Sequence, residues 1–261
     1  MPQPALTAQA RTVWERLAGL PVVFAPVLRP AVSPRSRLCP PGWAGLVVIA
    51  DAAIATVPDA DTAQIMQQAL SRVPMASLTD LAVLNSELVI TDVLGPATLA
   101  YLDSKDFRPP PGPASTEILD ISDPALAPLL SDRDTRDLDE SGIVEITSPA
   151  FVIRKQDRIV AAAGYRDWPG QVAHMSVLTA VHARGRGLGR VAASAAVAHA
   201  LRENKLAQWR ARPQASRQIA RRLGFQELGS QVSLRLASDT PSERQESDSP
   251  RPASATGADD G

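Results

Sequence analysis

The stretch HARGRGLGR, residues 182–190, contains three glycines, three arginines and no acidic residue. It follows an apolar run, SVLTAV at 176–181, and precedes an alanine-rich run, VAASAAVAHALREN at 191–204. This order predicts a strand, a glycine-rich turn and a helix. The free N–H groups and the dipole at the start of such a helix favour anions, and the arginines add positive charge. We therefore expect this turn to bind a phosphate-bearing ligand.

Two common phosphate-binding motifs do not fit this turn. A Walker loop requires a lysine followed by Ser or Thr after its second glycine, and the turn has neither. The dinucleotide fingerprint G-x-G-x-x-G fails because the glycines are Gly185, Gly187 and Gly189. Glycines at these positions would still let the backbone approach a bulky diphosphate closely. A tight helix start with close packing is the alternative explanation for them.

Composition divides the chain into three regions. Residues 1–113 are expected to form an N-terminal α/β region that ends in the proline-rich stretch RPPPGP at 108–113, which cannot continue a helix or a sheet. Residues 114–237 are expected to form a second domain around the glycine turn. Residues 238–261 lack aliphatic side chains beyond Ala and are predicted to be disordered.

Periodicity and turn residues predict the elements of both structured regions. In the N-terminal region we expect a helix at 6–20, two strands within 43–57, a helix at 61–73 and a strand at 95–103. In the second region we expect a short helix at 124–132, three antiparallel strands within 150–181, a strand at 207–212, a helix ending at Gly224 and a strand at 231–236.

Charge and cysteine content exclude several classes of protein. The chain has 27 basic and 28 acidic residues, which argues against general binding to nucleic acid or to a membrane surface. A weaker alternative, contact with RNA or DNA through the arginines of 202–222, lacks an accompanying set of stacking aromatics. Cys39 is the only cysteine, so neither an intrachain disulfide nor a multi-cysteine zinc site can form, and no metal is expected. With no signal sequence and no long apolar run, we expect a cytoplasmic protein.

The glycine turn resembles the signature R/Q-x-x-G-x-G/A of the GNAT acetyltransferase superfamily, which RGRGLG at 184–189 matches in full. SRQIARRLGF at 216–225 is similar to a later helix of that family, which typically ends in Leu-Gly-Phe. The resemblance covers about 118–236 and implies the α/β (α+β) class, with a mixed, mostly antiparallel twisted sheet flanked by helices. The upstream region resembles the N-terminal extension of bacterial members, and a degenerate second copy of the fold is one reading of it.

The resemblance implies an N-acetyltransferase that uses acetyl-CoA as co-substrate. The acceptor would be an amine, on a small molecule or a protein, that attacks directly in a ternary complex. The strand at 176–179 would separate from its neighbour, and the backbone N–H of Leu178, or of Val177, would polarise the thioester carbonyl. The implied coenzyme-binding residues are Val177, Leu178, Thr179, Arg184, Gly185, Arg186, Gly187, Leu188, Gly189, Arg190 and Ser216.

The sequence departs from the family at two positions. Pro213 stands where many members have Asn, and Ala220 stands where many have the Tyr that protonates the leaving thiolate. A catalytically impaired CoA-binding regulatory module therefore remains a second hypothesis. Tyr165 is the replacement candidate for the acid, and His174, which titrates near neutrality, is the candidate base. Ordinary strand residues are the alternative for both, and Glu140 either lines an acceptor site or caps a turn.

The acceptor and the oligomeric state are left open by the sequence, and a homodimer is one of the states left open.

Overall fold

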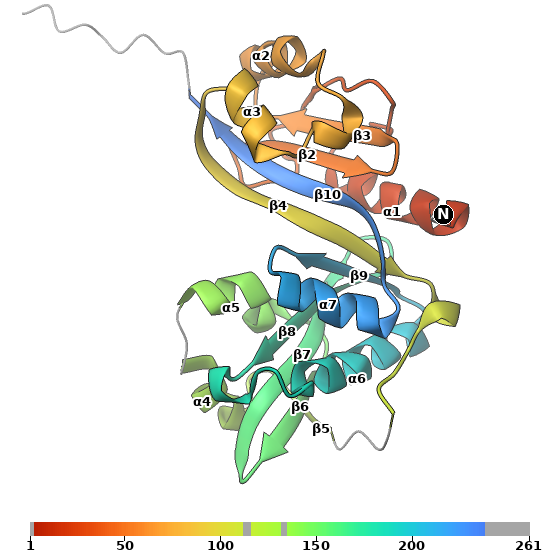
Figure 1. Ribbon diagram of the computed structural model, residues 1–261, viewed down its shortest axis with the longest axis vertical. Coiled ribbons are helices and arrows are strands. Elements are labelled where there is room, and N and C mark those ends of the chain that lie inside the picture. Colours follow the sequence, from red (N-terminus) through yellow and green to blue (C-terminus); the bar gives the residue numbers. More distant parts are fainter. Residues whose placement is uncertain (1–2, 112–115, 132–134, 238–261) are drawn as a thin grey trace, which may run out of the picture.

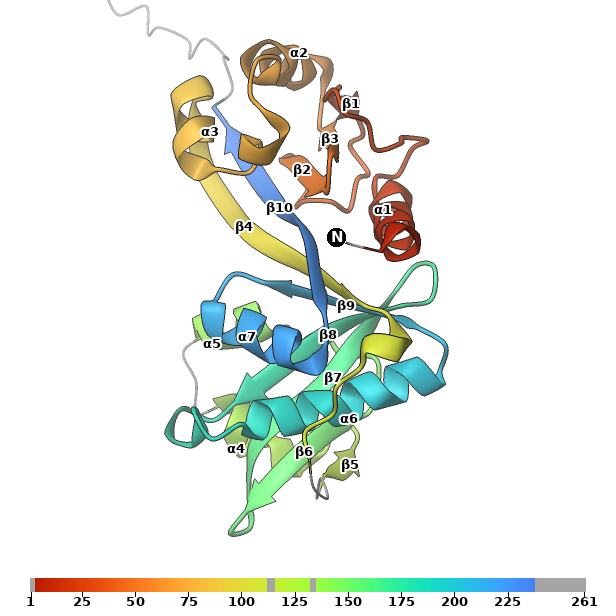
Figure 2. The same cartoon turned by 45° about the vertical axis from the view of Figure 1, so that its right-hand side comes forward.

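The structure is a computed structural model of the chain, and it describes residues 3–111, 116–131 and 135–237. The predicted disordered tail at 238–261 and the proposed boundary between 113 and 114 lie outside the described residues. Figures 1 and 2 show an upper half built from the N-terminal elements and a lower half that carries the glycine turn. Two long strands connect the halves.

The elements follow the sequence prediction closely in type and order. The described helices are α1 (Pro4–Leu17), α2 (Ala60–Leu70), α3 (Leu81–Glu87), α4 (Ala127–Ser131), α5 (Thr135–Ser141), α6 (Leu188–Arg202) and α7 (Gln214–Leu223). The described strands are β1 (Ala31–Val32), β2 (Ala44–Ile49), β3 (Ala52–Val57), β4 (Ile90–Leu102), β5 (Glu117–Leu119), β6 (Ala150–Lys155), β7 (Arg158–Trp168), β8 (Val172–Thr179), β9 (Leu206–Ala211) and β10 (Gln226–Leu236). The three strands expected within 150–181 are confirmed as the antiparallel β6, β7 and β8.

All described strands belong to one ten-stranded sheet, in the order β1-β3-β2-β10-β4-β9-β8-β7-β6-β5. Within it β8 and β9 are parallel, as are β1 and β3, and the other neighbours are antiparallel. The predicted fold class, a mixed and mostly antiparallel sheet flanked by helices, is therefore confirmed.

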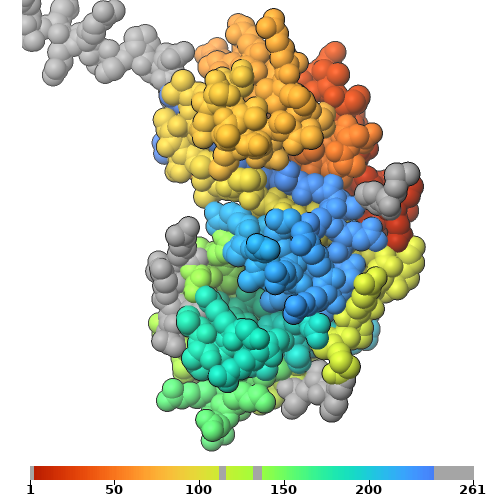
Figure 3. Space-filling view, viewed as in Figure 1, coloured from red at the N-terminus to blue at the C-terminus, as the bar shows by residue number. Residues whose placement is uncertain are grey.

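The strands β4 and β10 are longer than predicted and start earlier, at Ile90 and Gln226. The reason is their mutual pairing, which continues past both predicted starts with three register shifts along its length. Because β4 also pairs with β9, and β10 with β2, these two strands join the N-terminal strands to those around the glycine turn. Figure 3 shows the C-terminal residues in blue between the N-terminal residues above and those of the glycine turn and α6 below.

Three apolar clusters hold the sheet and helices together. The largest packs α6 on β6–β8, where small side chains of the helix are fully buried and permit a close approach. A second cluster packs α1 on the sheet around Trp14, whose indole Nε1 donates to the hydroxyl of Tyr101 on β4 at 2.6 Å. A third packs α2 and α3 on the N-terminal strands. The few aromatic residues thus sit at junctions, and Ala, Val, Leu and Ile fill the rest.

The two faces of the sheet differ around β9. On one face Trp209 donates from its indole to Ser216 of α7 at 3.0 Å. On the other face Gln208 contacts His174 of β8, and Tyr101 pairs with Gln208 across β4 and β9. Because side chains alternate along a strand, Gln208 and Arg210 lie on the same face, opposite α7. The polar alternation of AQWRAR at 207–212 therefore produces one polar face, as predicted.

Candidate functional site

The glycine turn leads from a 3₁₀ turn, Val181–Ala183, into α6. Gly185 and Gly187 have φ angles of +77° and +76°. This left-handed conformation costs an L-residue about 1–2 kcal/mol. A Cβ added to either glycine would meet no atom within 4 Å. The backbone path therefore favours glycine at both positions, and the space beside them is open.

The start of α6 presents unpaired donors. Gly187 is the N-cap residue, no side chain caps the helix, and its first turn contains no acidic residue. The first N–H groups of a helix have no acceptor within it, so they remain available here. Together with the helix dipole and the neighbouring Arg190, they favour an anion such as a phosphate group.

A cavity of about 380 Å³ lies between the glycine turn, β8, β9 and α7, and is called the turn cavity below. It opens because β8 pairs with β9 only from Val172 to His174, and the strands separate beyond that point. Its lining includes every residue that we predicted to bind the coenzyme except Arg186, which is exposed and lies outside it. The structure thus brings ten of the predicted residues together around one opening, while a role for Arg186 stays a prediction.

The backbone direction along β8 decides which N–H group faces the turn cavity. Ala180 donates its N–H to the carbonyl of Val160, next to the start of a β7–β8 ladder that contains no register shift. N–H groups alternate along a strand, so Leu178 also directs its N–H toward β7, whereas Val177 directs its N–H toward the gap. The prediction that Leu178 polarises a thioester through its N–H is therefore wrong. Val177, the other candidate, has the required direction.

Close packing fixes the helix start against β8. A Cβ added to Gly189 would lie 2.5 Å from Oγ1 of Thr179 and 3.5 Å from Cγ1 of Val177. Glycine at 189 therefore lets α6 begin directly against the strand. On the opposite side, Arg184 forms an ion pair with Asp137 of α5 at 2.8 Å, which ties the turn to that helix.

A second cavity, of about 420 Å³, adjoins the first and is called the arginine cavity below. Its lining comes from α5, β7, β8, β9 and β10, and from the N-terminal stretches 37–40 and 94–97. The two cavities share Glu140, Ser141, Met175 and Arg210 in their linings. A ligand in the turn cavity can therefore reach a ligand in the arginine cavity beside β8.

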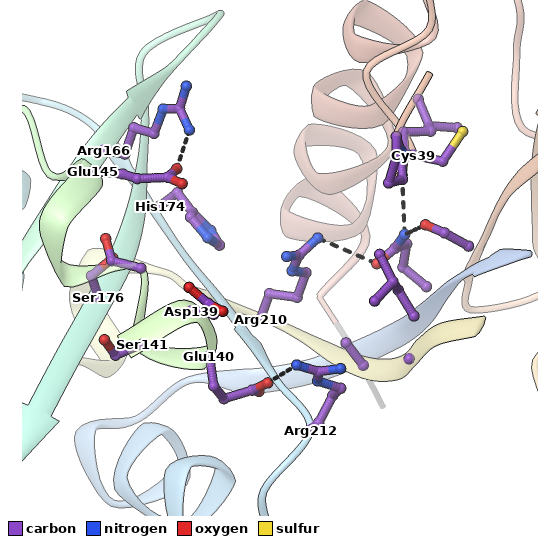
Figure 4. A pocket seen from close by; sticks show the side chains of 18 of the residues that line it. Cys39, Asp139, Glu140, Ser141, Glu145, Arg166, His174, Ser176, Arg210 and Arg212 are labelled. Carbon is purple, nitrogen blue, oxygen red and sulfur yellow. Dashed lines mark hydrogen bonds and ion pairs between the residues drawn. The ribbon is translucent and has the colours of Figure 1, made fainter. Parts of the chain in front are cut away.

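Charged side chains of both signs line the arginine cavity, as Figure 4 shows. The lining contains four arginines and three carboxylates: Arg37, Arg166, Arg210, Arg212, Asp139, Glu140 and Glu145. Two of the carboxylates form ion pairs, Glu145 with Arg166 and Glu140 with Arg212. Arg210 instead donates to Oε1 of Gln231 at 3.4 Å.

His174 lines the arginine cavity but has lost its basicity. Its ring stacks on Trp168 with centroids 4.3 Å apart, and its Nδ1 contacts Oε1 of Gln208. Burial is the main reason that the pKa of His174 falls to about 3, and the charge of Arg210 lowers it as well. The imidazole is therefore neutral near pH 7 and a weak base. The structure does not support His174 as the general base, although its ring can still accept a hydrogen bond.

Tyr165 lies away from both cavities. Its side chain is 2% exposed, and its hydroxyl is 2.9 Å from Nδ1 of His199 on α6. Burial raises the pKa of this hydroxyl. The structure therefore does not support Tyr165 as the general acid. Tyr101, the other tyrosine of the chain, also lies outside both linings.

The sequence of residues 148–230 matches the family described as GNAT acetyltransferase. This match contains β6 to β9, the glycine turn and α7, and so most of the residues that line the turn cavity. The chain therefore contains a region, residues 148–230, that matches the GNAT acetyltransferase family. A comparison with curated proteins finds no match.

Several solved GNAT structures resemble this one in fold. A GCN5-related N-acetyltransferase from Kribbella flavida is 22% identical, with a TM-score of 0.44, over 60% of this chain and 63% of that one. An acetyltransferase of the GNAT family from Colwellia psychrerythraea is 12% identical, with a TM-score of 0.43, over 66% and 70%. A ribosomal-protein-alanine N-acetyltransferase from Brucella melitensis is 20% identical, with a TM-score of 0.33, over 47% and 99%. At these identities and scores, the similarities do not identify a substrate for this GNAT protein.

The two departures from the GNAT pattern have structural consequences. Ala220 is 2% exposed and belongs to the apolar cluster beneath α7, so the usual tyrosine position carries no proton donor. Pro213 is the N-cap residue of α7 and lines the turn cavity without an N–H group. Ser216 also lines this cavity, and its hydroxyl accepts from Trp209 while keeping its own proton for a ligand.

Three residues of the GNAT site were not predicted from the sequence: Asp139, Arg210 and Gln231. The alternation around Arg210 indicated a polar strand face but not what that face borders. In the part of the chain that the structure describes, no group of three or more His, Cys, Asp or Glu side chains could hold a metal ion. Among the same residues, no helix is long and apolar enough to cross a membrane.

Proposed function

We propose that this GNAT protein transfers an acetyl group from acetyl-CoA to an amine, by direct attack in a ternary complex. The observation that carries the proposal is the junction of the two cavities beside β8, where both linings include Met175 and Arg210. A co-substrate in the turn cavity and an acceptor in the arginine cavity would meet there, next to the outward N–H of Val177. The match to the GNAT family supports acyl transfer in general.

The turn cavity fits the coenzyme part of the substrate. Its glycine turn leaves open space at Gly185 and Gly187, and the unpaired N–H groups of α6 suit a pyrophosphate. The gap between β8 and β9 offers main-chain groups to an extended chain in the manner of an added strand. The thioester would then lie near Val177.

The chemistry follows from these positions. As the amine nitrogen bonds to the acetyl carbon, negative charge develops on the carbonyl oxygen, and the N–H of Val177 stabilises it more than it stabilises the ground state. The carbon–sulfur bond then breaks and the thiolate leaves. The amine proton passes to water or to a carboxylate of α5, where Asp139 and Glu140 line the acceptor side. Water protonates the thiolate, because neither tyrosine of the chain lines a cavity.

Two measurements test the proposal. Isothermal calorimetry should show that acetyl-CoA binds, and a thiol-release assay with mass spectrometry should show an acetylated amine formed in equal amount to free CoA. A variant of Arg158, an exposed residue in the β6–β7 hairpin, serves as the control. No binding at millimolar acetyl-CoA would refute the proposal. Binding without turnover of any amine would instead favour the regulatory module.

A further inference from the structure

We infer that the acceptor carries a carboxylate as well as its amine, and that Arg210 binds this carboxylate in the arginine cavity. The inference rests on the proposed function, because it concerns the acceptor of the same reaction. It narrows the acceptor to amino acids and short peptides with a free carboxylate. It argues against polyamines and aminoglycosides, which carry no carboxylate for the two arginines of this cavity that have no ion-pair partner among the described residues.

The first support is the way in which Arg210 is held. Its guanidinium donates to Oε1 of Gln231, a side chain that is only 3% exposed. The amide of Gln231 in turn donates to the carbonyl of Leu38 at 3.0 Å and to Oγ of Ser233 at 2.8 Å. Because both the oxygen and the nitrogen of this buried amide are hydrogen-bonded, its side chain is held rigidly. Gln231 is therefore a positioning residue that holds the guanidinium at the cavity wall.

The second support is that Arg210 forms no direct ion pair among the described residues, although Glu140 and Glu145 lie near enough to act on its charge. Arg166 and Arg212 each pair with a glutamate, but among the described residues no carboxylate lies within ion-pair distance of Arg210 or Arg37. Arg37 directly precedes Leu38, whose carbonyl accepts from Gln231. Two arginines with no ion-pair partner thus line the cavity near one buried amide. Planar guanidinium groups bind carboxylates with two parallel hydrogen bonds, which makes a carboxylate the natural partner.

The third support comes from α5, which contributes a carboxylate to the same lining. Asp139 of α5 lines the same cavity, and among the described residues it forms no ion pair. A carboxylate in this lining suits an ammonium group, just as the arginines suit a carboxylate. The two arginines and the one carboxylate without an ion-pair partner therefore correspond to a zwitterionic acceptor. The cavity volume, about 420 Å³, is suited to a small molecule and leaves room for a side chain.

Three matched series of acceptors test the inference: L-amino acids, their carboxamides, and the amines left when the carboxylate is removed. Each series keeps a primary amine and the side chain, and because the carboxylate also affects the pKa of the amine, kcat/KM is compared per concentration of unprotonated amine. We expect kcat/KM for the amino acids to exceed that of the other two series by about 10-fold or more, the usual scale of a charge-assisted hydrogen-bonded pair. Equal or better use of the carboxamides or amines would overturn the inference.

Variants test whether Arg210 is the residue that distinguishes amino acids from their carboxamides. Arg210→Gln should reduce the ratio between amino acid and carboxamide toward one, mainly through the KM of the acceptor. Gln231→Glu should have a similar effect on the ratio, because the new carboxylate would pair with Arg210 in the substrate's place. Arg158→Gln is the matched control and should keep the ratio. An Arg210→Gln variant that slows all three series equally would overturn the inference.

The acceptor test and the function test fail in different ways. Loss of acetyl-CoA binding concerns the turn cavity and refutes the proposed function. Acetyl-CoA binding without turnover of any member of the three series overturns the acceptor inference. Turnover restricted to amines without a carboxylate overturns the inference as well, while the proposed transfer stands.

Discussion

The contact between Gly189 and Thr179 gives the sharpest test of the turn cavity. Replacing Gly189 by Ala would place a Cβ 2.5 Å from Oγ1 of Thr179, whereas real Cβ contacts essentially never fall below 3.0 Å. Either the strand residue or the start of α6 must therefore move by about 0.5 Å, the difference between these two distances. Overpacking of this kind costs about 1–3 kcal/mol.

The cost of Gly189→Ala must appear in one of two measurements. If α6 stays in place, the free energy of unfolding falls by the full overpacking cost, which unfolding in urea measures. If α6 moves, its N–H groups lose their alignment with the phosphates, and the affinity for acetyl-CoA falls by about 5- to 150-fold. Calorimetry and urea unfolding on the same sample separate the two cases.

A second substitution identifies the cause. Thr179→Ala removes Oγ1, and the next contacts of a Cβ at 189 are ordinary ones, 3.5 Å to Val177 and 3.6 Å to Ile219. In the Thr179→Ala background, Gly189→Ala should therefore lower the free energy of unfolding, or the affinity for acetyl-CoA, much less than it does alone. The double-mutant cycle should then show that the effects of the two substitutions are not additive. Unchanged stability together with unchanged affinity in the single variant Gly189→Ala would refute the reasoning.

Three further predictions follow from other contacts. Gly187→Val should weaken acetyl-CoA binding, whereas Gly42→Val, with a similar left-handed φ of +78° and open surroundings, should only lower stability. Because the folded protein holds His174 neutral, with a pKa of about 3, stability present above pH 6.5 should be lost as the pH falls toward 3. In urea unfolding, the free energy of unfolding of His174→Gln should fall less steeply with decreasing pH than that of the unchanged protein. The difference in slope should be up to about 1.4 kcal/mol per pH unit. Trp14→Phe removes the indole that donates to the buried hydroxyl of Tyr101, and should lower the free energy of unfolding in urea by about 1–3 kcal/mol. Adding Tyr101→Phe, which removes this hydroxyl, should partly restore the free energy of unfolding.

The features predicted from the sequence are those that neighbouring residues determine. The glycine turn requires left-handed backbone at Gly185 and Gly187, and the composition of 182–190 shows this directly. The three strands from β6 to β8 are joined by short turns, so their pairing also follows from local order. Identifying Leu178 as the polarising residue failed for a different reason. The choice between adjacent residues depends on the ladder register, which the sequence does not specify.

The features missed depend on pairing between distant segments. The strand β4 lies between β9 and β10, although more than a hundred residues separate it from either in the chain. His174 looked like a base because the sequence contains the residue but not its burial against Trp168 and Gln208. The sequence marks Arg210 only as one of several polar residues on a strand, because its contact with Gln231 comes from a different strand.

The two cavities differ in how far apart in the sequence their lining residues lie. Residues within 137–222 line the turn cavity, so one continuous stretch of chain forms the proposed coenzyme site. The arginine cavity also needs the N-terminal stretches 37–40 and 94–97, together with β10. Gln231 contacts both sides, since its amide bonds the carbonyl of Leu38 while its oxygen accepts from Arg210. The N-terminal region is thus part of the proposed acceptor site, and we expect changes there to alter the choice of acceptor while the proposed coenzyme site stays the same.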